Sequence, residues 1–458
     1  MAHREAAASR NINSTSGLQK SNPVSSKPIL HPTSAFYPIN SAYEATPSPH
    51  HGRLRIAIIG GGLAGASAAG SFARLPNVQV TVYEQSDAIR EVGALIGVMV
   101  SGMKSLSRML SPDSLDALQS VLYRGENVDG INHRHWRTGE ILTTAISPHT
   151  HRQMQEGRCT RVELHRVLMK DVPDGTFVYG KKVVQVEKVN KSNEREGSEM
   201  KLHFLDNSTE CADLVIAADG LYSYVPNAKV RYLGRVSYRH VVPWETVQHI
   251  KGLPTDTSSW RRNGEVAFMS PLVGGYSFTC MDWDPLINKV LEALPNMEAY
   301  PLEAASWLGN LVYDDMVAFV GDAAHHFGKA TAGGGGVGSS LAFADVRALY
   351  LSLWRTYDPR YNPSPTASKT PYNVPYALHL YNETRRYFLK RVERQIGYDR
   401  LDTMYIAAAG DDEVEWMRRY RERFTINWFI LEDEVDAKWQ EVEAEERHHW
   451  PKKFKASI

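Results

Sequence analysis

The sequence is poor in cysteine. Its three cysteines, Cys159, Cys211 and Cys280, lie far apart and form no CxxC spacing. They are too few to supply a disulfide framework for a chain of 458 residues. We therefore expect buried free thiols in a reducing compartment, and a cytoplasmic protein.

An excess of charge is also lacking. Lys and Arg together number 52, as do Asp and Glu, and no basic stripe with interleaved aromatic residues is present. This balance argues against a nucleic-acid partner. No run of about 18 apolar residues occurs, because the longest apolar segment, 54–69, is interrupted by glycines. We therefore expect no membrane span.

The first part of the chain, residues 1–52, lacks a sustained apolar period and is rich in Ser, Pro, Asn and Ala. This composition predicts a disordered tail. A transit peptide is the alternative, because basic residues outnumber acidic ones there, although no amphipathic Arg-rich helix is evident.

From residue 55 the pattern changes to RIAIIGGGLAGASAAGSFARLPNVQVTVYEQ. It predicts an apolar strand, a glycine turn, a helix of small residues, and a second strand that ends in an acid. Gly60, Gly62 and Gly65 form a GxGxxG motif in the context that dinucleotide binding requires. The turn and the helix N-terminus would hold a diphosphate, and Glu84 would accept from a ribose hydroxyl. An acid at this position favours FAD or NAD, and a purely structural glycine turn is the alternative.

Further elements follow in the same manner. We expect a helix over 159–170 and strands at 181–188 and 201–205. An apolar strand in 213–223 ends at Asp219-Gly220, and 230–279 alternates β-prone and polar residues, which predicts an antiparallel sheet in a second domain.

The stretch GDAAHHFGKATAGGGG, 321–336, combines an acid, two histidines and four consecutive glycines. A strand at 316–320 precedes it and a helix begins near residue 340, so the glycines lie at a helix N-terminus. His325 and His326 are adjacent and cannot converge on one metal ion, so we expect no metal site. A connecting loop without chemistry is the alternative for the glycine run.

The last part of the chain is expected to be helical. Residues 356–375 are rich in Pro, Ser, Asn and Tyr, which is typical of an exposed insertion. Two helical segments follow, and the second carries an aromatic and aliphatic stripe that favours core packing over a cofactor box. The stripe consists of Phe424, Trp428, Leu431, Val435 and Trp439.

Taken in this order, the motifs resemble those of the salicylate hydroxylase-like flavoprotein monooxygenases, which have the para-hydroxybenzoate hydroxylase fold. The similarity runs from about 53 to about 445. Its anchors are the GxGxxG with Glu84, an Arg-x-x-Leu segment at 161–164, a DG motif at 219–220 and a GD motif at 321–325. The resemblance implies that Arg161, Asp219 and Asp322 contact FAD and that the glycine run, Gly335 included, approaches the flavin.

The implied fold class is α/β, with a Rossmann-like (GR2-type) FAD-binding domain, an inserted antiparallel-sheet substrate domain and a C-terminal helical segment. The expected boundaries are 53–229 and 311–355 for the FAD-binding domain, 230–310 for the substrate domain, 356–375 for the insertion and 376–458 for the C-terminal helices.

The resemblance also implies a reaction. FAD reduced by NADPH or NADH would react with O2, and a flavin C4a-hydroperoxide would hydroxylate an aromatic or phenolic small molecule. The candidate catalytic residues are Arg239, His240, Tyr238 and His325, since a cation or base near a phenol oxygen helps the ring to react. Structural roles are the alternatives for Arg239 and His240. The sequence leaves the oligomeric state open, with a homodimer as one candidate.

The sequence departs from the family at three places. Leu95 stands in the segment 93–96 that matches the GAGI motif, Pro226 stands where an arginine is expected, and the GD loop lacks a proline. These departures leave an FAD-dependent oxidase, epoxidase or ring-forming enzyme as an alternative. A second alternative is a protein that has kept the fold for binding or regulation and lost turnover.

Overall fold

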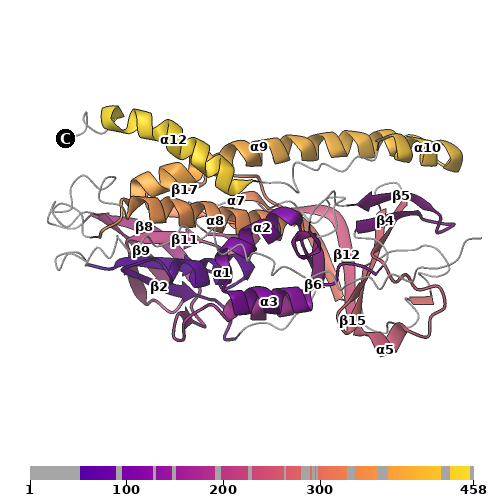
Figure 1. The fold of residues 1–458 in the computed structure, drawn as a ribbon, viewed down its shortest axis with the longest axis horizontal. Coiled ribbons are helices and arrows are strands. Elements are labelled where there is room, and N and C mark those ends of the chain that lie inside the picture. The colour runs from indigo at the N-terminus through magenta and orange to yellow at the C-terminus, as the bar shows by residue number, and fades with distance from the viewer. Residues whose placement is uncertain are drawn as a thin grey trace, which may run out of the picture.

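The computed structural model shows a mixed α/β protein with two large sheets (Figure 1). The expected tail lies outside the described residues, apart from residue 52. The residues that the structure describes are 52–88, 95–126, 130–146, 151–190, 198–224, 230–262, 265–279, 289–290, 294, 298–326, 336–357, 370–423 and 434–453.

The first sheet has six strands in the order β17-β18-β11-β1-β2-β7. At its centre β1, Leu54–Ile59, pairs in parallel with β2, Val78–Tyr83, and with β11, Leu214–Ala217. Every residue of β11 is buried, as expected for a parallel strand covered on both faces. The other strands are β18 (Val317–Phe319), β17 (Val312–Tyr313) and β7 (Phe177–Val178).

Helices rich in small residues pack on this sheet. α1, Leu63–Phe72, follows β1 directly, and its Ala, Gly and Ser residues are nearly all buried, which allows close packing against α4 and α8. The predicted βαβ unit is therefore present. The other helices of this part are α2 (Val100–Met109), α3 (Pro112–Val121), α4 (Arg161–Met169), α7 (Asp322–His325) and α8 (Val337–Thr356).

The second sheet has seven strands in the order β16-β12-β15-β14-β13-β4-β5. Its pairs are antiparallel except β13 with β4, which are parallel. One face buries an apolar core against α5, Trp244–Val247. The strands are β16 (Glu298–Ala304), β12 (Arg231–Pro243), β15 (Gly275–Thr279), β14 (Glu265–Leu272), β13 (Ser258–Arg262), β4 (Gly130–His135) and β5 (Ile141–Ile146).

The origin of β4 and β5 differs from the expected boundaries. Both strands come from the stretch 53–229, which the sequence pattern assigns to the FAD-binding part, yet they extend the second sheet. Besides pairing with β5, β4 joins that sheet through β13, more than 100 residues later in the chain. Local periodicity indicates that a strand forms but carries no information about a partner this distant.

Two smaller sheets complete the strand pairing. A three-stranded antiparallel sheet has the order β10-β9-β8, and β3 pairs antiparallel with β6. Leu95 and Ile96 lie in β3, whereas Gly93 and Ala94 fall outside the described residues. The strands are β8 (Val183–Asn190), β9 (Ser198–Phe204), β10 (Thr209–Ala212), β3 (Leu95–Val98) and β6 (Gly157–Thr160).

Three C-terminal helices run along one side of the molecule (Figure 1). α9, Val374–Ala407, packs on α8, and α10, Glu413–Arg423, turns back along the end of α9 and contacts β4 and β5. α12, Val435–Lys453, packs on α8 and α9. Val435 and Trp439 of the predicted stripe are buried in α12, whereas its other three members lie outside the described residues.

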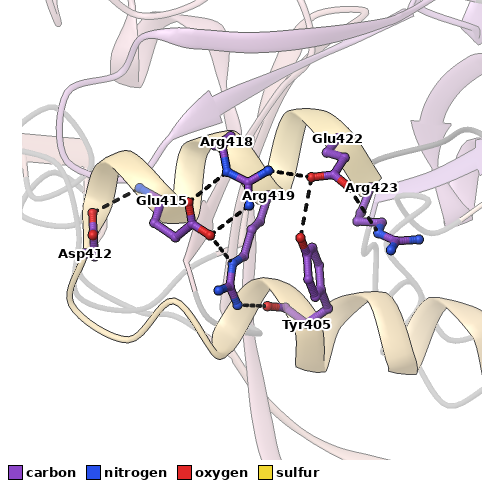
Figure 2. A network of polar contacts seen from close by, with 7 residues as sticks. All are labelled: Tyr405, Asp412, Glu415, Arg418, Arg419, Glu422 and Arg423. Atoms are coloured by element: carbon purple, nitrogen blue, oxygen red, sulfur yellow. Dashed lines mark hydrogen bonds and ion pairs between the residues drawn. The ribbon is translucent and has the colours of Figure 1, made fainter.

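A polar network joins α10 to the end of α9 (Figure 2). Glu415 accepts hydrogen bonds from Arg418 and Arg419, and Arg419 also donates to the carbonyl oxygen of Tyr405 on α9 at 2.9 Å. Asp412 caps the first turn of α10 through the backbone N–H of Glu415, 3.0 Å away. Of these contacts, the bond from Arg419 to Tyr405 links the two helices, and the others lie within α10 and its cap.

The predicted insertion differs from expectation at its C-terminal end. Residues 358–369 lie outside the described part of the chain. Tyr372 is 2% exposed, and its hydroxyl donates to the carbonyl oxygen of Pro76 at 2.6 Å. This end therefore packs against the core instead of lying in solvent. Among the described helices, no segment is long and apolar enough to cross a membrane.

Candidate functional site

The glycine turn between β1 and α1 leaves no room for side chains. Gly60 has a φ of +93°, and a Cβ there would lie 2.7 Å from the carbonyl oxygen of Ala218. A Cβ on Gly65 would lie 1.9 Å from the carbonyl oxygen of Gly60. Both positions therefore require glycine, one for its left-handed backbone and one for the close approach of helix and strand.

Glu84 lies where the sequence predicts it, directly after β2. Its Oε2 accepts from the backbone N–H of Gly61 at 2.7 Å, and its Oε1 accepts from Ser86 N at 2.9 Å. The carboxylate is thereby held beside the glycine turn with lone pairs left for further donors.

Helix α4 brings two side chains to the same turn. Thr160 and Glu163 form a capping box at its N-terminus. Arg161 is exposed, and its Nη2 lies 3.4 Å from the position of a Cβ on Gly62. One turn later, the buried His165 contacts the carbonyl oxygen of Gly61 at 2.7 Å. His165 was not among the predicted site residues, although its i, i+4 spacing from Arg161 is a signal that could have identified it.

The DG motif follows β11, next to β1 in the sheet. Asp219 begins a short 3-10 turn, Gly220–Tyr222, and Gly220 has a φ of +77°. Burial raises the pKa of the Asp219 carboxyl, against smaller lowering effects from Ser223 and from the N–H of Tyr224. Its Oδ1 is buried and makes no hydrogen bond of good geometry with the described residues. A buried oxygen of this kind is suited to accept from a ligand hydroxyl.

The GD motif forms the tight entry to α7. Gly321 has a φ of +61°, and a Cβ there would lie 3.0 Å from that of Ala342 on α8. Asp322 is the first residue of α7, and its side chain is 47% exposed. Its Oδ1 lies 3.5 Å from the position of a Cβ on Gly338, near the N-terminus of α8. Gly335 itself lies outside the described residues.

A buried charge network supports this turn. Asp345 on α8 accepts from Gly321 N at 2.9 Å, from His325 Nε2 at 2.6 Å and from Arg385 Nε at 2.8 Å. Burial alone would raise the pKa of Asp345, but His325 and Arg385 outweigh it, and the pKa lies below its usual range. The ring of His325 is 1% exposed and donates to Asp345, so the ring is not open to a substrate. Its predicted catalytic role therefore gains no support from its position.

His326 is directed elsewhere. Its Nε2 lies 3.9 Å from Asp322 Oδ2, so the two adjacent histidines serve different carboxylates. Within the part of the chain that the structure describes, no three His, Cys, Asp or Glu side chains are grouped for a metal ion.

These motifs meet at the carboxyl ends of β1, β2, β11 and β18, where open α/β sheets bind ligands. Peptide N–H groups at the α1 terminus, the nearby Arg161 guanidinium and the Glu84 carboxylate match a diphosphate and a ribose. Asp219 Oδ1 and the exposed Asp322 offer acceptors for further hydroxyl groups. The residues present therefore fit FAD.

The predicted catalytic residues of β12 do not share one face. Arg239 donates from Nε to Ser237 Oγ at 3.0 Å, so these two side chains lie on the same face. Tyr238 and His240 project from the opposite face, because side chains alternate along a strand. Tyr238 is 39% exposed. One ligand on the sheet therefore contacts either Arg239 or the other pair.

Arg239 is half-buried in an aromatic setting. Burial lowers the pKa of its guanidinium, and the ring of Tyr300 lies 5.8 Å away. No carboxylate among the described side chains pairs with it. Pairing across the sheet aligns it with Phe268 on β14, Ser259 on β13 and His133 on β4. These paired residues form a row across the sheet from Arg239 to His133. At the His133 end of this row, the Tyr420 hydroxyl of α10 lies 3.2 Å from His133 Nδ1.

No family model matches the chain. A 6-hydroxynicotinate 3-monooxygenase of Pseudomonas fluorescens is 31% identical over 202 residues, 42% of this chain and 49% of that protein. The FAD-dependent monooxygenase eupB of Phoma sp is 29% identical over 46% of this chain and 48% of that protein. The chain thus spans about half the length of these two relatives. The 6-methylsalicylate 1-monooxygenase atA of Aspergillus terreus is 26% identical over 81% of this chain and 87% of that protein.

Solved structures agree with the fold. Klebsiella pneumoniae HpxO complexed with FAD and uric acid matches with a TM-score of 0.62 at 20% identity, over 84% of this chain and 96% of that one. A salicylate hydroxylase substrate complex matches with a TM-score of 0.63 at 17% identity, over 85% of this chain and 98% of that one. The mixed α/β fold of FAD-binding monooxygenases is confirmed. The predicted resemblance is also confirmed, because the named relatives are monooxygenases that act on aromatic compounds.

Proposed function

We propose that this chain is an FAD-dependent monooxygenase that uses NADPH or NADH and O2 to hydroxylate an aromatic or phenolic small molecule. The observation that carries the proposal is the meeting of four separate motifs at one edge of the parallel sheet. The glycine turn, Glu84, Asp219 and Asp322 come from segments far apart in the chain, yet all border the same edge. A structural glycine turn alone would not need the other three.

In the proposed architecture, the six-stranded sheet and its helices bind FAD and the seven-stranded sheet binds the substrate. The N–H groups at the start of α1 and the guanidinium of Arg161 hold the diphosphate. Glu84 accepts from the adenosine ribose, and Asp219 and Asp322 accept from hydroxyl groups of the ribityl chain. Bound FAD supplies hydride acceptance from NADPH or NADH and the activation of O2.

Arg239 is the proposed substrate residue. A half-buried guanidinium without a described carboxylate partner favours an anion beside it. A phenol held there loses its proton more readily, and the phenolate ring is a stronger nucleophile at its ortho and para carbons. Tyr238 and His240 remain predictions, and they would act only on a substrate held at the opposite face of β12.

The first test is the absorption spectrum of the purified protein, followed anaerobically with NADPH or NADH. The aromatic panel includes salicylate, 6-methylsalicylate and 6-hydroxynicotinate. A monooxygenase shows flavin bleaching that an aromatic compound accelerates, and a hydroxylated product after O2 is admitted. Protein without flavin, even after incubation with FAD, contradicts the proposal. Flavin that an organic substrate reduces directly, without NADPH or NADH, indicates the oxidase alternative.

The substrate role of Arg239 is tested with Arg239→Ala. Substrate-stimulated NADPH or NADH oxidation should fall at least a hundredfold, since a charge-assisted contact of about 3 kcal/mol is lost, while FAD stays bound. Arg239→Lys keeps the charge and should retain part of the rate. The control is Arg231→Ala, which removes an exposed arginine from the start of the same strand. Equal product formation in Arg239→Ala and the wild type removes Arg239 from the site.

Oligomeric state remains a prediction. A homodimer is the candidate state, and sedimentation equilibrium at several protein concentrations would test it.

A further inference from the structure

His165 holds the second peptide of the glycine turn. The side chain of His165 comes from α4, and it is 5% exposed. Its Nε2 is 2.7 Å from the carbonyl oxygen of Gly61, across 104 residues of sequence. A carbonyl oxygen only accepts, so Nε2 carries the proton and donates it. His165 belongs to none of the recognised motifs.

The direction of the Gly61 carbonyl group also fixes the direction of the Gly62 N–H group. In a trans peptide, the C=O and the following N–H point to opposite sides. With the Gly61 oxygen directed at His165, the N–H of Gly62 points away from α4. Gly62 is the N-cap of α1, and no side chain caps that end of the helix. The N–H groups there are available to an anion, as at other helix N-termini that bind phosphates.

Glu84 holds the neighbouring peptide in the same way. Its Oε2 accepts from Gly61 N at 2.7 Å, which sets the peptide between Gly60 and Gly61. Both peptides that flank Gly61 therefore have one polar group held by a side chain. Three consecutive glycines have wide conformational freedom, and the two contacts remove much of it before a ligand arrives.

The surroundings of His165 favour a neutral ring that donates from Nε2. Burial lowers the pKa of His165, partly offset by its hydrogen bond to Gly61. Its Nδ1 is buried and has no hydrogen-bond partner among the described residues. Protonation would place a second N–H in this site without an acceptor. The neutral ring with hydrogen on Nε2 makes the hydrogen bond to Gly61, which is its contact among the described residues.

We propose that His165 is a positioning residue that orients the Gly61–Gly62 peptide so that the turn binds the diphosphate of a dinucleotide. The proposal rests on the FAD binding proposed above, and it extends the binding motif from Arg-x-x-Leu to Arg-x-x-Leu-His on α4. Arg161 supplies charge at the turn, and His165 supplies the backbone geometry.

The test compares three variants by FAD affinity, measured from the quenching of flavin fluorescence. His165→Leu keeps the bulk and removes the donor, and FAD should bind about tenfold more weakly. His165→Gln carries an amide NH2 near the place of Nε2 and should restore most of the affinity. His249→Leu removes an exposed histidine of the second domain and should leave affinity unchanged. Thermal unfolding of each FAD-free variant shows that the comparison is made on folded protein.

ADP separates this proposal from the proposed function, because ADP carries the diphosphate without the flavin. Its affinity should fall by the same factor in His165→Leu as that of FAD. Binding of ADP without binding of FAD contradicts the flavin assignment but still tests His165. Wild-type affinity for both ligands in His165→Leu, equal losses in the Leu and Gln variants, or no binding of either ligand by the wild type each overturns the proposal. Nitrogen NMR of the histidine rings should show hydrogen on Nε2 of His165.

Discussion

Replacing Asp345 by asparagine should destabilise the protein far more than the small change in shape suggests. Asp345 is fully buried and accepts from Gly321 N at 2.9 Å, His325 Nε2 at 2.6 Å and Arg385 Nε at 2.8 Å. Asparagine has one carbonyl oxygen and one NH2 group, so at least one of these donors would face another donor. The change also removes the negative charge that the buried Arg385 guanidinium faces.

The expected loss follows from the burial of both partners. Arg385 is 1% exposed and Asp345 is 0% exposed. Removing one partner of a buried, hydrogen-bonded ion pair costs about 3–5 kcal/mol. We expect the free energy of unfolding of Asp345→Asn to fall by that amount, measured by urea denaturation of the FAD-free protein with far-UV circular dichroism.

Glu415 provides the matched control. It accepts from Arg418 Nε and Nη2, both at 2.8 Å, and from Arg419 Nε at 2.7 Å, but it does so at the surface (Figure 2). Glu415→Gln makes the same chemical change, and we expect little loss because water replaces the lost contacts. Equal losses in the two variants would refute the argument, since burial would then not set the cost.

The pH dependence gives the same prediction a second measurement. The pKa of Asp345 in the fold lies below its ordinary value of 3.8. The folded state therefore binds fewer protons than the unfolded state as pH falls past this value. The stabilisation by Asp345 is present above pH 3.8 and is lost as pH falls through the folded pKa. Asp345→Asn should lack this acid-dependent part of the unfolding free energy.

Two further predictions concern the turn and the second sheet. Gly65→Ala places a Cβ 1.9 Å from the carbonyl oxygen of Gly60, so this variant should be purified without flavin. The control is Gly397→Ala, at an exposed position of α9 with open space around it. This variant should bind FAD normally, and the alanine should stabilise the helix by about 0.5–1 kcal/mol. Burial lowers the pKa of His133 to about 2 from 6.5, so the neutral ring stabilises the fold above pH 6.5 and this stabilisation is lost as pH falls. Between pH 6.5 and 4.5 the wild type should therefore lose about 2–3 kcal/mol more than His133→Gln in urea denaturation, and equal losses would contradict the burial of a neutral ring.

Local features of the site could be predicted from the sequence. Gly60, Gly65 and Glu84 lie in one βαβ unit, where the strand, the turn and the helix follow directly from apolar spacing and glycine. Asp219 and Gly321 each follow an apolar strand, so their positions at strand ends could also be predicted. In each case, the residue and the element that positions it are neighbours in the chain.

Contacts between distant segments could not be predicted in this way. The hydrogen bond from His165 to Gly61 spans 104 residues, and the pair between Asp345 and Arg385 joins two helices. Apolar periodicity shows which face of a helix is buried but not which polar side chain meets which partner. The placement of His325 shows the consequence, because its motif position suggested chemistry and its partner Asp345 assigns it to the support of a turn.

The hairpin formed by α9 and α10 contacts both the sheet edge proposed to bind FAD and the sheet proposed to bind the substrate. α9 has 34 residues, a length of about 50 Å, and Arg385 in its first half donates to Asp345, which supports the turn at Gly321. The α10 helix that follows contacts α9 through the bond from Arg419 to Tyr405 (Figure 2), and its Tyr420 reaches His133 in the strand row that contains Arg239. The GD turn and the strand row that contains Arg239 are thus both contacted by the same helical hairpin, one through Asp345 and the other through His133. Such a shared contact suits a reaction in which the ring to be hydroxylated must be held at a fixed distance from the flavin, since small displacements of reacting groups cost large factors in rate.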